Sequence, residues 1–259
     1  MSSRLHTFDA LDNFRDYGDY ATEAGRRIAC GRLFRSAHHA RATDADLERL
    51  AGLSIATVVD LRRPGERRAQ PSRRPQGFTG AVIASDLDDG REAPHITFLK
   101  TADLTADSGR RFMTDTYRRL PFEPAHLDLF RRYFLALAEG GGPVLIHCAA
   151  GKDRTGLLAA LTHHVLGVTE EDMLADYLLT NTAVDLEGRA PAIARQLYEM
   201  TGRAPSHSAV VAFLGVEADY LRAAIQAMEA RCGSIDGYLD QALGLDRTLR
   251  DRIADRLAA

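Results

Sequence analysis

The chain has no tryptophan and, among 33 basic residues, only two lysines, Lys100 and Lys152. Its three cysteines, Cys30, Cys148 and Cys232, are too few and too scattered for a disulfide framework. No Cys-x-x-Cys pair suggests a zinc site. Each thiol must therefore be considered by itself. Because nearly all basic residues are arginine, each of the two lysines is a candidate for a specific role.

Long apolar runs are absent as well. No stretch approaches the roughly 18 consecutive apolar residues of a membrane span, and residues 1–16 lack the apolar core of a signal peptide. We therefore expect a cytoplasmic protein, although export by a route without a signal peptide stays open. The formal net charge of −3, with 45% hydrophobic and 27% charged residues, favours neither disorder nor binding to nucleic acid.

Local patterns predict an α/β protein with a helical C-terminal half. Short apolar or β-branched runs predict strands at 25–29, 32–36, 55–59, 81–84 and 144–146. Apolar spacing, caps and proline breaks predict helices after Thr43, at two places within 108–139, at 154–166, and from 169 onward at 186–201, 207–231, 235–243 and 246–258. Residues 62–75 and 86–110 are predicted to be loops. No linker or repeat divides the chain, so we expect one domain over 1–259.

The segment His147–Gly156 reads His-Cys-Ala-Ala-Gly-Lys-Asp-Arg-Thr-Gly and joins a predicted strand to a predicted helix. Such a loop directs several backbone N–H groups, and the positive end of the helix dipole, at one spot that favours an anion. A cysteine there ionises more readily than a free thiol. Arg154, six positions after Cys148, can curl back and offer two donors to a tetrahedral dianion. We expect phosphate to be held by Ala149, Ala150, Gly151, Lys152, Asp153 and Arg154.

Cys148 and Arg154 at this spacing predict nucleophilic attack on phosphorus. The sulfur would form a cysteinyl-phosphate, which water then hydrolyses. The N–H groups and Arg154 would neutralise the equatorial oxygens, so we expect no metal ion and no cofactor. A nucleotide-binding P-loop is excluded, because Lys152 is followed by Asp153 and Ile146 stands where that motif needs glycine.

Several further segments carry a resemblance to a known family. They are Asn13–Gly18, Phe34–Ser36, Val59–Arg62, Asp176–Tyr177, Asn181, Leu214–Val216, Tyr220–Leu221 and Gly233–Leu239. With the loop at 147–156, they make the chain resemble the bacterial atypical tyrosine phosphatases of the mycobacterial protein tyrosine phosphatase B type, over nearly its whole length. The resemblance implies a cysteine-phosphatase fold, with a central, mostly parallel sheet flanked by helices and a helical lid within about 170–231.

The resemblance also implies a substrate class. Members of the family act on phosphotyrosine, and relatives also accept phosphoserine, phosphothreonine and phosphoinositides. In the wider group a lysine at the position of Lys152 is part of the preference for phosphoinositides, so a phosphoinositide or inositol phosphatase is the alternative. An inactive phosphate-binding module is disfavoured because Cys148 and Arg154 are both present.

The general acid has two candidate sources. Without tryptophan, the chain has no literal Trp-Pro-Asp loop to supply it. The resemblance favours Asp153, although this carboxylate could instead accept backbone hydrogen bonds and stabilise the loop. The other source is the acidic cluster Asp86, Asp88 and Asp89, which could equally be a solvated turn.

Two more loop residues are expected to support catalysis. We expect His147 to order the loop and Thr155 to donate its hydroxyl to the sulfur, with a purely structural role as the alternative for both. Arg15, Arg35 and Arg62 either face the site or pair with neighbouring carboxylates such as Asp16, Asp60 or Glu66.

Overall fold

The structure is a computed structural model that describes residues 4–87 and 94–258. Within these residues five strands form one sheet in the order β1-β2-β5-β3-β4. The strands are β1 (Arg15–Asp16), β2 (Leu33–Ser36), β3 (Thr57–Asp60), β4 (Ala81–Ala84) and β5 (Val144–His147). The β1–β2 pairing is antiparallel and the other pairings are parallel, so the prediction of a central, mostly parallel sheet is confirmed.

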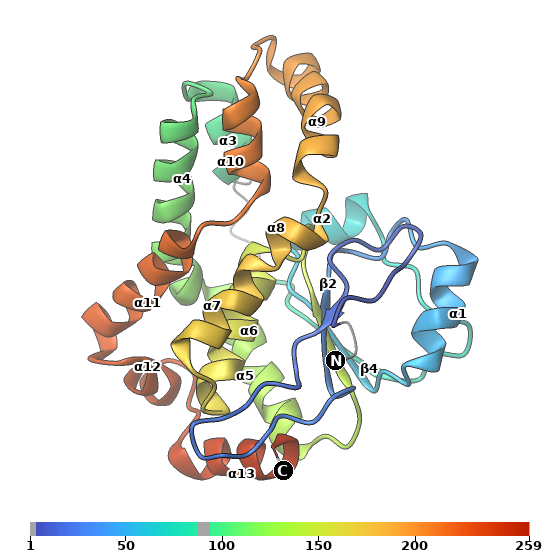
Figure 1. The fold of residues 1–259 in the computed structure, drawn as a ribbon, viewed down its shortest axis with the longest axis vertical. Coiled ribbons are helices and arrows are strands. Elements are labelled where there is room, and N and C mark those ends of the chain that lie inside the picture. The colour runs from blue at the N-terminus through green and yellow to red at the C-terminus, as the bar shows by residue number, and fades with distance from the viewer. Residues whose placement is uncertain (1–3, 88–93, 259) are drawn as a thin grey trace.

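Helices surround this sheet and make up most of the C-terminal half (Figure 1). They are α1 (Asp44–Gly52), α2 (Pro64–Ala69), α3 (Pro94–Thr101), α4 (Ala106–Arg119), α5 (Pro124–Glu139), α6 (Asp153–Val165), α7 (Glu170–Leu178), α8 (Thr180–Ala183), α9 (Leu186–Thr201), α10 (His207–Leu214), α11 (Ala218–Cys232), α12 (Ile235–Gln241) and α13 (Arg247–Leu257), with a 3₁₀ turn, η1, at Leu120–Phe122. None of the helices within 4–87 and 94–258 has the length and apolar content needed to cross a membrane.

Alternation along the strands gives the sheet two apolar faces. Phe34, Val58 and Leu145, which are neighbours in register, belong to a cluster that also contains Leu50 of α1. Residues one position away in the strands belong instead to the main core, into which α5 and α6 pack. This follows from the two-residue repeat of a strand, which sends successive side chains to opposite faces. Figure 1 shows α1 on one side of the sheet and α5 and α6 on the other.

A separate helical layer stands beyond the sheet, formed by α3, α4, α9 and α10 (Figure 1). Leu99, Ala190, Leu197 and Val210 form its own buried cluster. The prediction of a loop over 86–110 was therefore wrong where α3 and the start of α4 lie. The helix α3 packs against α9, which lies about ninety residues later, and no local pattern could reveal that contact.

Local signals located most other element boundaries correctly. Thr43 and Asp46 form the predicted capping box of α1, and the chain breaks between α4 and α5 at Pro121 and Pro124. Three predictions were wrong in part. The helix over 207–231 is interrupted between Leu214 and Ala218, α2 occupies part of the predicted loop at 62–75, and residues 25–29 form only isolated bridges.

A buried cluster of charges joins the edge of the sheet to α7. Asp176 of α7 binds Arg15 Nε through Oδ1 at 3.2 Å and Arg35 Nη1 through Oδ2 at 2.7 Å, and all three side chains are almost fully buried. Burial alone would raise the pKa of Asp176, but the guanidinium groups of Arg15 and Arg35 outweigh it and hold the pKa below its usual value. The carboxylate therefore compensates two cations that have no access to water.

Replacing Asp176 should destabilise the fold and change its dependence on pH. We expect Asp176→Asn to lower the free energy of unfolding by about 3–5 kcal/mol, because it leaves two buried cations uncompensated. Because folding depresses the pKa of Asp176, its contribution is present above the usual carboxyl pKa of about 3.9 and is lost as the pH falls below it. Urea unfolding of the wild type and the variant between acid and neutral pH measures both effects.

The matched control is Glu171→Gln, which removes an exposed carboxylate from the same helix. We expect it to leave the free energy of unfolding nearly unchanged. Equal effects of the two substitutions would contradict the role assigned to Asp176.

Candidate active site

The loop between β5 and α6 lies at the carboxyl edge of the sheet. Ser36, His147 and Asp60 end the parallel strands β2, β5 and β3 and are paired in register. Cys148 follows His147 directly, and α6 begins at Asp153. The carboxyl ends of parallel strands, next to a helix N-terminus, are where open α/β sheets bind anionic ligands. The predicted strand-loop-helix arrangement is therefore present.

Gly151 gives this loop a conformation that other residues rarely adopt. Its φ is +68°, and a Cβ added there would lie 2.4 Å from the carbonyl carbon and oxygen of Ser36. Its carbonyl oxygen accepts hydrogen bonds from Asn13 Nδ2 at 2.9 Å and Arg35 Nη2 at 3.1 Å. Arg35 is itself held by Asp176, so the buried charge cluster fixes the position of the loop.

The loop presents its backbone donors rather than its acceptors to the space above it. The carbonyl of Ala149 accepts a hydrogen bond from the His38 N–H at 3.1 Å, and the carbonyl of Gly151 accepts from Asn13 Nδ2. The N–H groups of Ala149, Ala150 and Gly151 donate to no described residue. Together with the N-terminus of α6, they form a cradle suited to an oxyanion.

Cys148 and Arg154 line one cavity of about 230 Å³ above this cradle. The cysteine is almost fully buried, with 2% of its surface exposed. Phe112 and Met113 of α4 and Phe213 of α10 form apolar walls, and Lys152 and Asp153 also lie in the lining. The cover of the cavity thus includes α4, which precedes the segment 170–231 from which a lid was expected.

Glu66 fixes the guanidinium of Arg154. Arg154 Nη1 lies 2.6 Å from Glu66 Oε2, and Nη2 lies 2.9 Å from Oε1, while Nη1 also donates to the Leu61 carbonyl at 3.2 Å. Burial would lower the pKa of Arg154, but the hydrogen bonds to Glu66 and the nearby Cys148 raise it above its usual value. A permanently charged, oriented guanidinium therefore borders the cavity.

Asp153 is held through one of its two carboxyl oxygens. Lys152 Nζ lies 2.9 Å from Asp153 Oδ1, and the Tyr117 hydroxyl donates to the same oxygen at 3.0 Å. Burial, and then the Asp153 charge, raise the pKa of Tyr117 well above its usual value, which keeps this hydroxyl a donor. Among the described residues, Oδ2 has no hydrogen-bond donor. Lys152 Nζ also donates to the Gly215 carbonyl at 3.4 Å, which links the loop to the end of α10.

The other candidate acids lie elsewhere or outside the described residues. The Asp86 side chain is 96% exposed, pairs with Arg67 at 2.6 Å and does not line the cavity with Cys148. Asp88 and Asp89 are outside the described residues. Among the candidate acids that can be placed, only Asp153 therefore lines the cavity with Cys148.

His147 and Thr155 are fully buried beneath the loop. Burial lowers the pKa of His147 to about 4, although Asp60 Oδ2 lies 3.7 Å from its Nε2, so the ring is neutral near neutral pH. The ring stacks on His39, with centroids 4.6 Å apart. The hydroxyl of Thr155 has no hydrogen-bond partner among the described residues, so its donation to the sulfur stays a prediction.

The residues that hold the site in place were not predicted from the sequence. Asp176 and Asn13 lie in segments that carry the family resemblance, but nothing local shows that they support the loop. Glu66 was considered as a partner for neighbouring arginines, whereas it binds Arg154. The one available signal was the sequence Arg63-Pro64 before Glu66, which is typical of a helix start and would have placed an ordered carboxylate there. Arg62 does pair with Asp60, at 2.7 Å, which was one of the two expectations for it.

The chain is similar to several known proteins. A family model described as the tyrosine phosphatase family matches residues 6–259. A candidate tyrosine-protein phosphatase of Cupriavidus necator is 37% identical over 92% of this chain and 84% of its own length. The triple specificity protein phosphatase PtpB of Mycobacterium tuberculosis is 36% identical over 89% of this chain and 91% of its own length. The solved structure of TpbA from P. aeruginosa matches 80% of this chain and 94% of that chain, at 17% identity and a TM-score of 0.31, which is too low to support a conclusion.

The pairing of Glu66 with Arg154 predicts a kinetic effect. We expect Glu66→Gln to lower kcat on an aryl phosphate by about 10- to 100-fold, because the guanidinium loses the anion that orients it. Glutamine can still accept the hydrogen bond from the Arg63 N–H, so the start of α2 should remain intact. Steady-state kinetics with circular dichroism as a check on folding measures the effect.

Glu123→Gln is the matched control, because Glu123 lines the same cavity but lies near Arg63 and His126 rather than Arg154. Its loss of kcat should be much smaller. Equal losses would mean that the charge of the cavity, and not the orientation of Arg154, determines the rate.

Proposed function

The chain belongs to the tyrosine phosphatase family and is a protein tyrosine phosphatase, and we propose that Cys148 is its nucleophile and Arg154 its phosphate clamp. One observation carries these roles. The buried Cys148 lies in a cavity bordered by backbone donors that bind no described residue and by a guanidinium that Glu66 holds in place. A phosphomonoester is the substrate that uses all three features at once.

In the first step the sulfur of Cys148 attacks phosphorus in line with the leaving oxygen. A phosphorus–sulfur bond forms as the phosphorus–oxygen bond breaks. Arg154 and the loop N–H groups bind the equatorial oxygens, where negative charge must be stabilised. Asp153 Oδ2 donates its proton to the leaving oxygen, and the alcohol or phenol departs. The two hydrogen bonds to Oδ1 support this role, because they orient the carboxyl and leave Oδ2 available.

In the second step water attacks the phosphorus of the cysteinyl-phosphate. Asp153, now a carboxylate, accepts a proton from the water, and the phosphorus–sulfur bond breaks to release inorganic phosphate. Thr155 would assist by donating its hydroxyl to the departing sulfur. Its complete burial and its lack of another partner among the described residues support this assignment.

Phosphotyrosine is the substrate that the cavity fits best. Phe112, Met113 and Phe213 offer apolar surface to an aromatic ring whose phosphate is bound at the loop. The name of the mycobacterial relative, a triple specificity phosphatase, supports a wider range of phosphoester substrates. The alternative of a phosphoinositide phosphatase depends on Lys152. Because its ammonium group is already paired with Asp153, no contact of a described residue favours a lipid substrate over phosphotyrosine.

Helices α4 and α10 form the proposed lid over the site. They supply Phe112, Met113 and Phe213 to the walls of the cavity. Their own packing partners, α3 and α9, complete a layer with a separate apolar cluster. Because α4 also packs on α11 and contributes Met113 and Tyr117 to the main core, it is the fixed part of this cover, and substrate entry is proposed to involve displacement of α10 together with α3 and α9.

Replacing the nucleophile tests the proposed function. We expect Cys148→Ser to lower kcat by more than about 10⁴-fold, because a hydroxyl without an activating base is a poor nucleophile. Binding of inorganic phosphate, measured by isothermal titration calorimetry, should persist because Arg154 and the loop are intact. Cys30→Ser, a substitution at an exposed thiol, is the control and should leave activity unchanged. Substantial turnover by Cys148→Ser would rule out the covalent mechanism.

Leaving-group dependence tests the general acid. We expect Asp153→Asn to slow hydrolysis of phenyl phosphate, a poor leaving group, by about 10²–10⁴-fold. Hydrolysis of 2,4-dinitrophenyl phosphate should change little, because its leaving group needs no proton. Asp86→Asn, at an exposed carboxylate, should affect neither substrate. Equal losses on both substrates in Asp153→Asn would assign Asp153 a structural role.

A further inference from the structure

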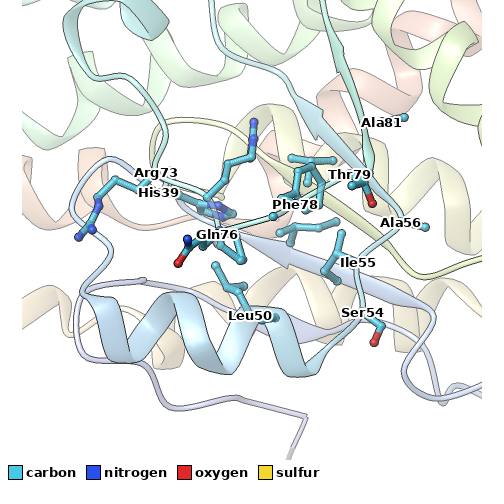
Figure 2. A pocket seen from close by; sticks show the side chains of 17 residues that line it. His39, Leu50, Ser54, Ile55, Ala56, Arg73, Gln76, Phe78, Thr79 and Ala81 are labelled. Carbon is cyan, nitrogen blue, oxygen red and sulfur yellow. The ribbon is translucent and has the colours of Figure 1, made fainter.

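A second cavity, larger than the catalytic one, lies between α1 and the segment 73–81 (Figure 2). Its volume is about 530 Å³, within the range of roughly 300–1,000 Å³ that is typical of small-molecule sites. None of the residues that line the catalytic cavity lines this one. Neither the proposed mechanism nor the relatives' names assigns it a role.

Apolar side chains form one part of the wall. Leu50 of α1, Ile55 and Phe78 lie together, and Figure 2 shows Leu50 and Ile55 directed toward Phe78. Val58 and Leu145 of the sheet also belong to the lining. An occupant could therefore bury a hydrocarbon chain or ring against them.

Arg74 gives the same cavity a cation that no described residue binds directly. The side chain is partly buried, and burial lowers its pKa from the usual value. It makes no hydrogen bond or ion pair with a described residue, although the charge of Asp60 attracts it, and the Phe78 ring centroid lies 5.6 Å away. The adjacent Arg73 differs, because it binds Asp44 at 2.6 Å and the Ala42 carbonyl at 2.5 Å. A partly buried cation normally has a direct counter-ion. Asp60, the carboxylate that attracts Arg74, is bound directly by Arg62 instead, so a ligand could supply the direct partner that Arg74 lacks among the described residues.

We propose that this cavity binds a small amphiphilic carboxylate, with the carboxylate on Arg74 and the apolar body against Leu50, Ile55 and Phe78. A guanidinium matches a carboxylate through two parallel hydrogen bonds. A ligand with one negative charge fits this cavity better than a phosphate dianion, because Asp44 already neutralises Arg73, the other arginine of the segment.

The occupant would contact residues that support the loop at 147–156, which we call the phosphate loop. His39 lines the cavity and stacks on His147, the residue before Cys148. Its Nε2 also lies 3.0 Å from the hydroxyl oxygen of Ser36, the residue on which Gly151 rests. Leu145 belongs to β5, which leads into the loop. The two cavities are thus separated by β5 and by a pair of histidine rings.

Binding of octanoate and of octan-1-ol to the full chain tests the proposal, and the measurement requires no turnover. Isothermal titration calorimetry should show saturable binding of about one equivalent of octanoate. The alcohol, which has the same chain but no charge, should bind about tenfold more weakly. In Arg74→Gln the preference for octanoate should disappear, whereas Arg73→Gln should retain it.

Two further measurements locate the binding site. Ala51→Phe, which adds a ring to the cavity from an exposed position of α1, should abolish binding of both compounds. Saturating inorganic phosphate should leave octanoate affinity unchanged, because phosphate occupies the other cavity. Displacement of octanoate by phosphate, an unchanged preference in Arg74→Gln, or no saturable binding to the wild type would overturn the proposal. None of these results would bear on the phosphatase activity itself.

Discussion

The phosphate loop depends on buried charges that do not line its cavity. Asp176 binds Arg15 and Arg35 in the interior, and Arg35 in turn donates to the Gly151 carbonyl. This contact holds the loop with the Gly151 carbonyl toward the interior of the protein, so that the N–H groups of the loop remain available to an anion. A buried ion cluster of this kind adds little net stability, because desolvation opposes it. Its role here is to fix one loop conformation. Removing one charge of the cluster nevertheless lowers the free energy of unfolding strongly, because the remaining charges stay buried without a partner.

Much of the fold, and the strand-loop-helix setting of Cys148 and Arg154, could be predicted, because their signals are local. The strand before Cys148, the glycine in the loop and the helix after Arg154 all lie within about twenty residues. Glu66 and Asp176 could not be assigned in the same way, since each contacts residues 88 or more positions away. The same limit explains α3, whose apolar residues pack against a helix much later in the chain. Sequence periodicity reports which face is apolar and not what covers it.

Lys152 stood out in the sequence as one of two lysines, and its environment changes its interpretation. Its ammonium bridges Asp153 and the Gly215 carbonyl, so it connects the phosphate loop, the candidate acid and the end of α10. The proposed lid and the acid therefore share one cation. On the other side of β5, Arg74 is a cation that no described residue binds directly, and it lines a cavity together with His39, the histidine that stacks on His147. Both sides of this strand thus carry groups that anions can engage.

The central claim is that phosphate passes through a covalent bond to Cys148. Rapid mixing with an aryl phosphate, an acid quench within the first turnover and mass spectrometry of the digested protein test it most directly. We predict a transient mass increase of one phosphoryl group on the peptide that contains Cys148, and none in Cys148→Ser. Active enzyme that never carries this modification, or carries it on another residue, would contradict the account.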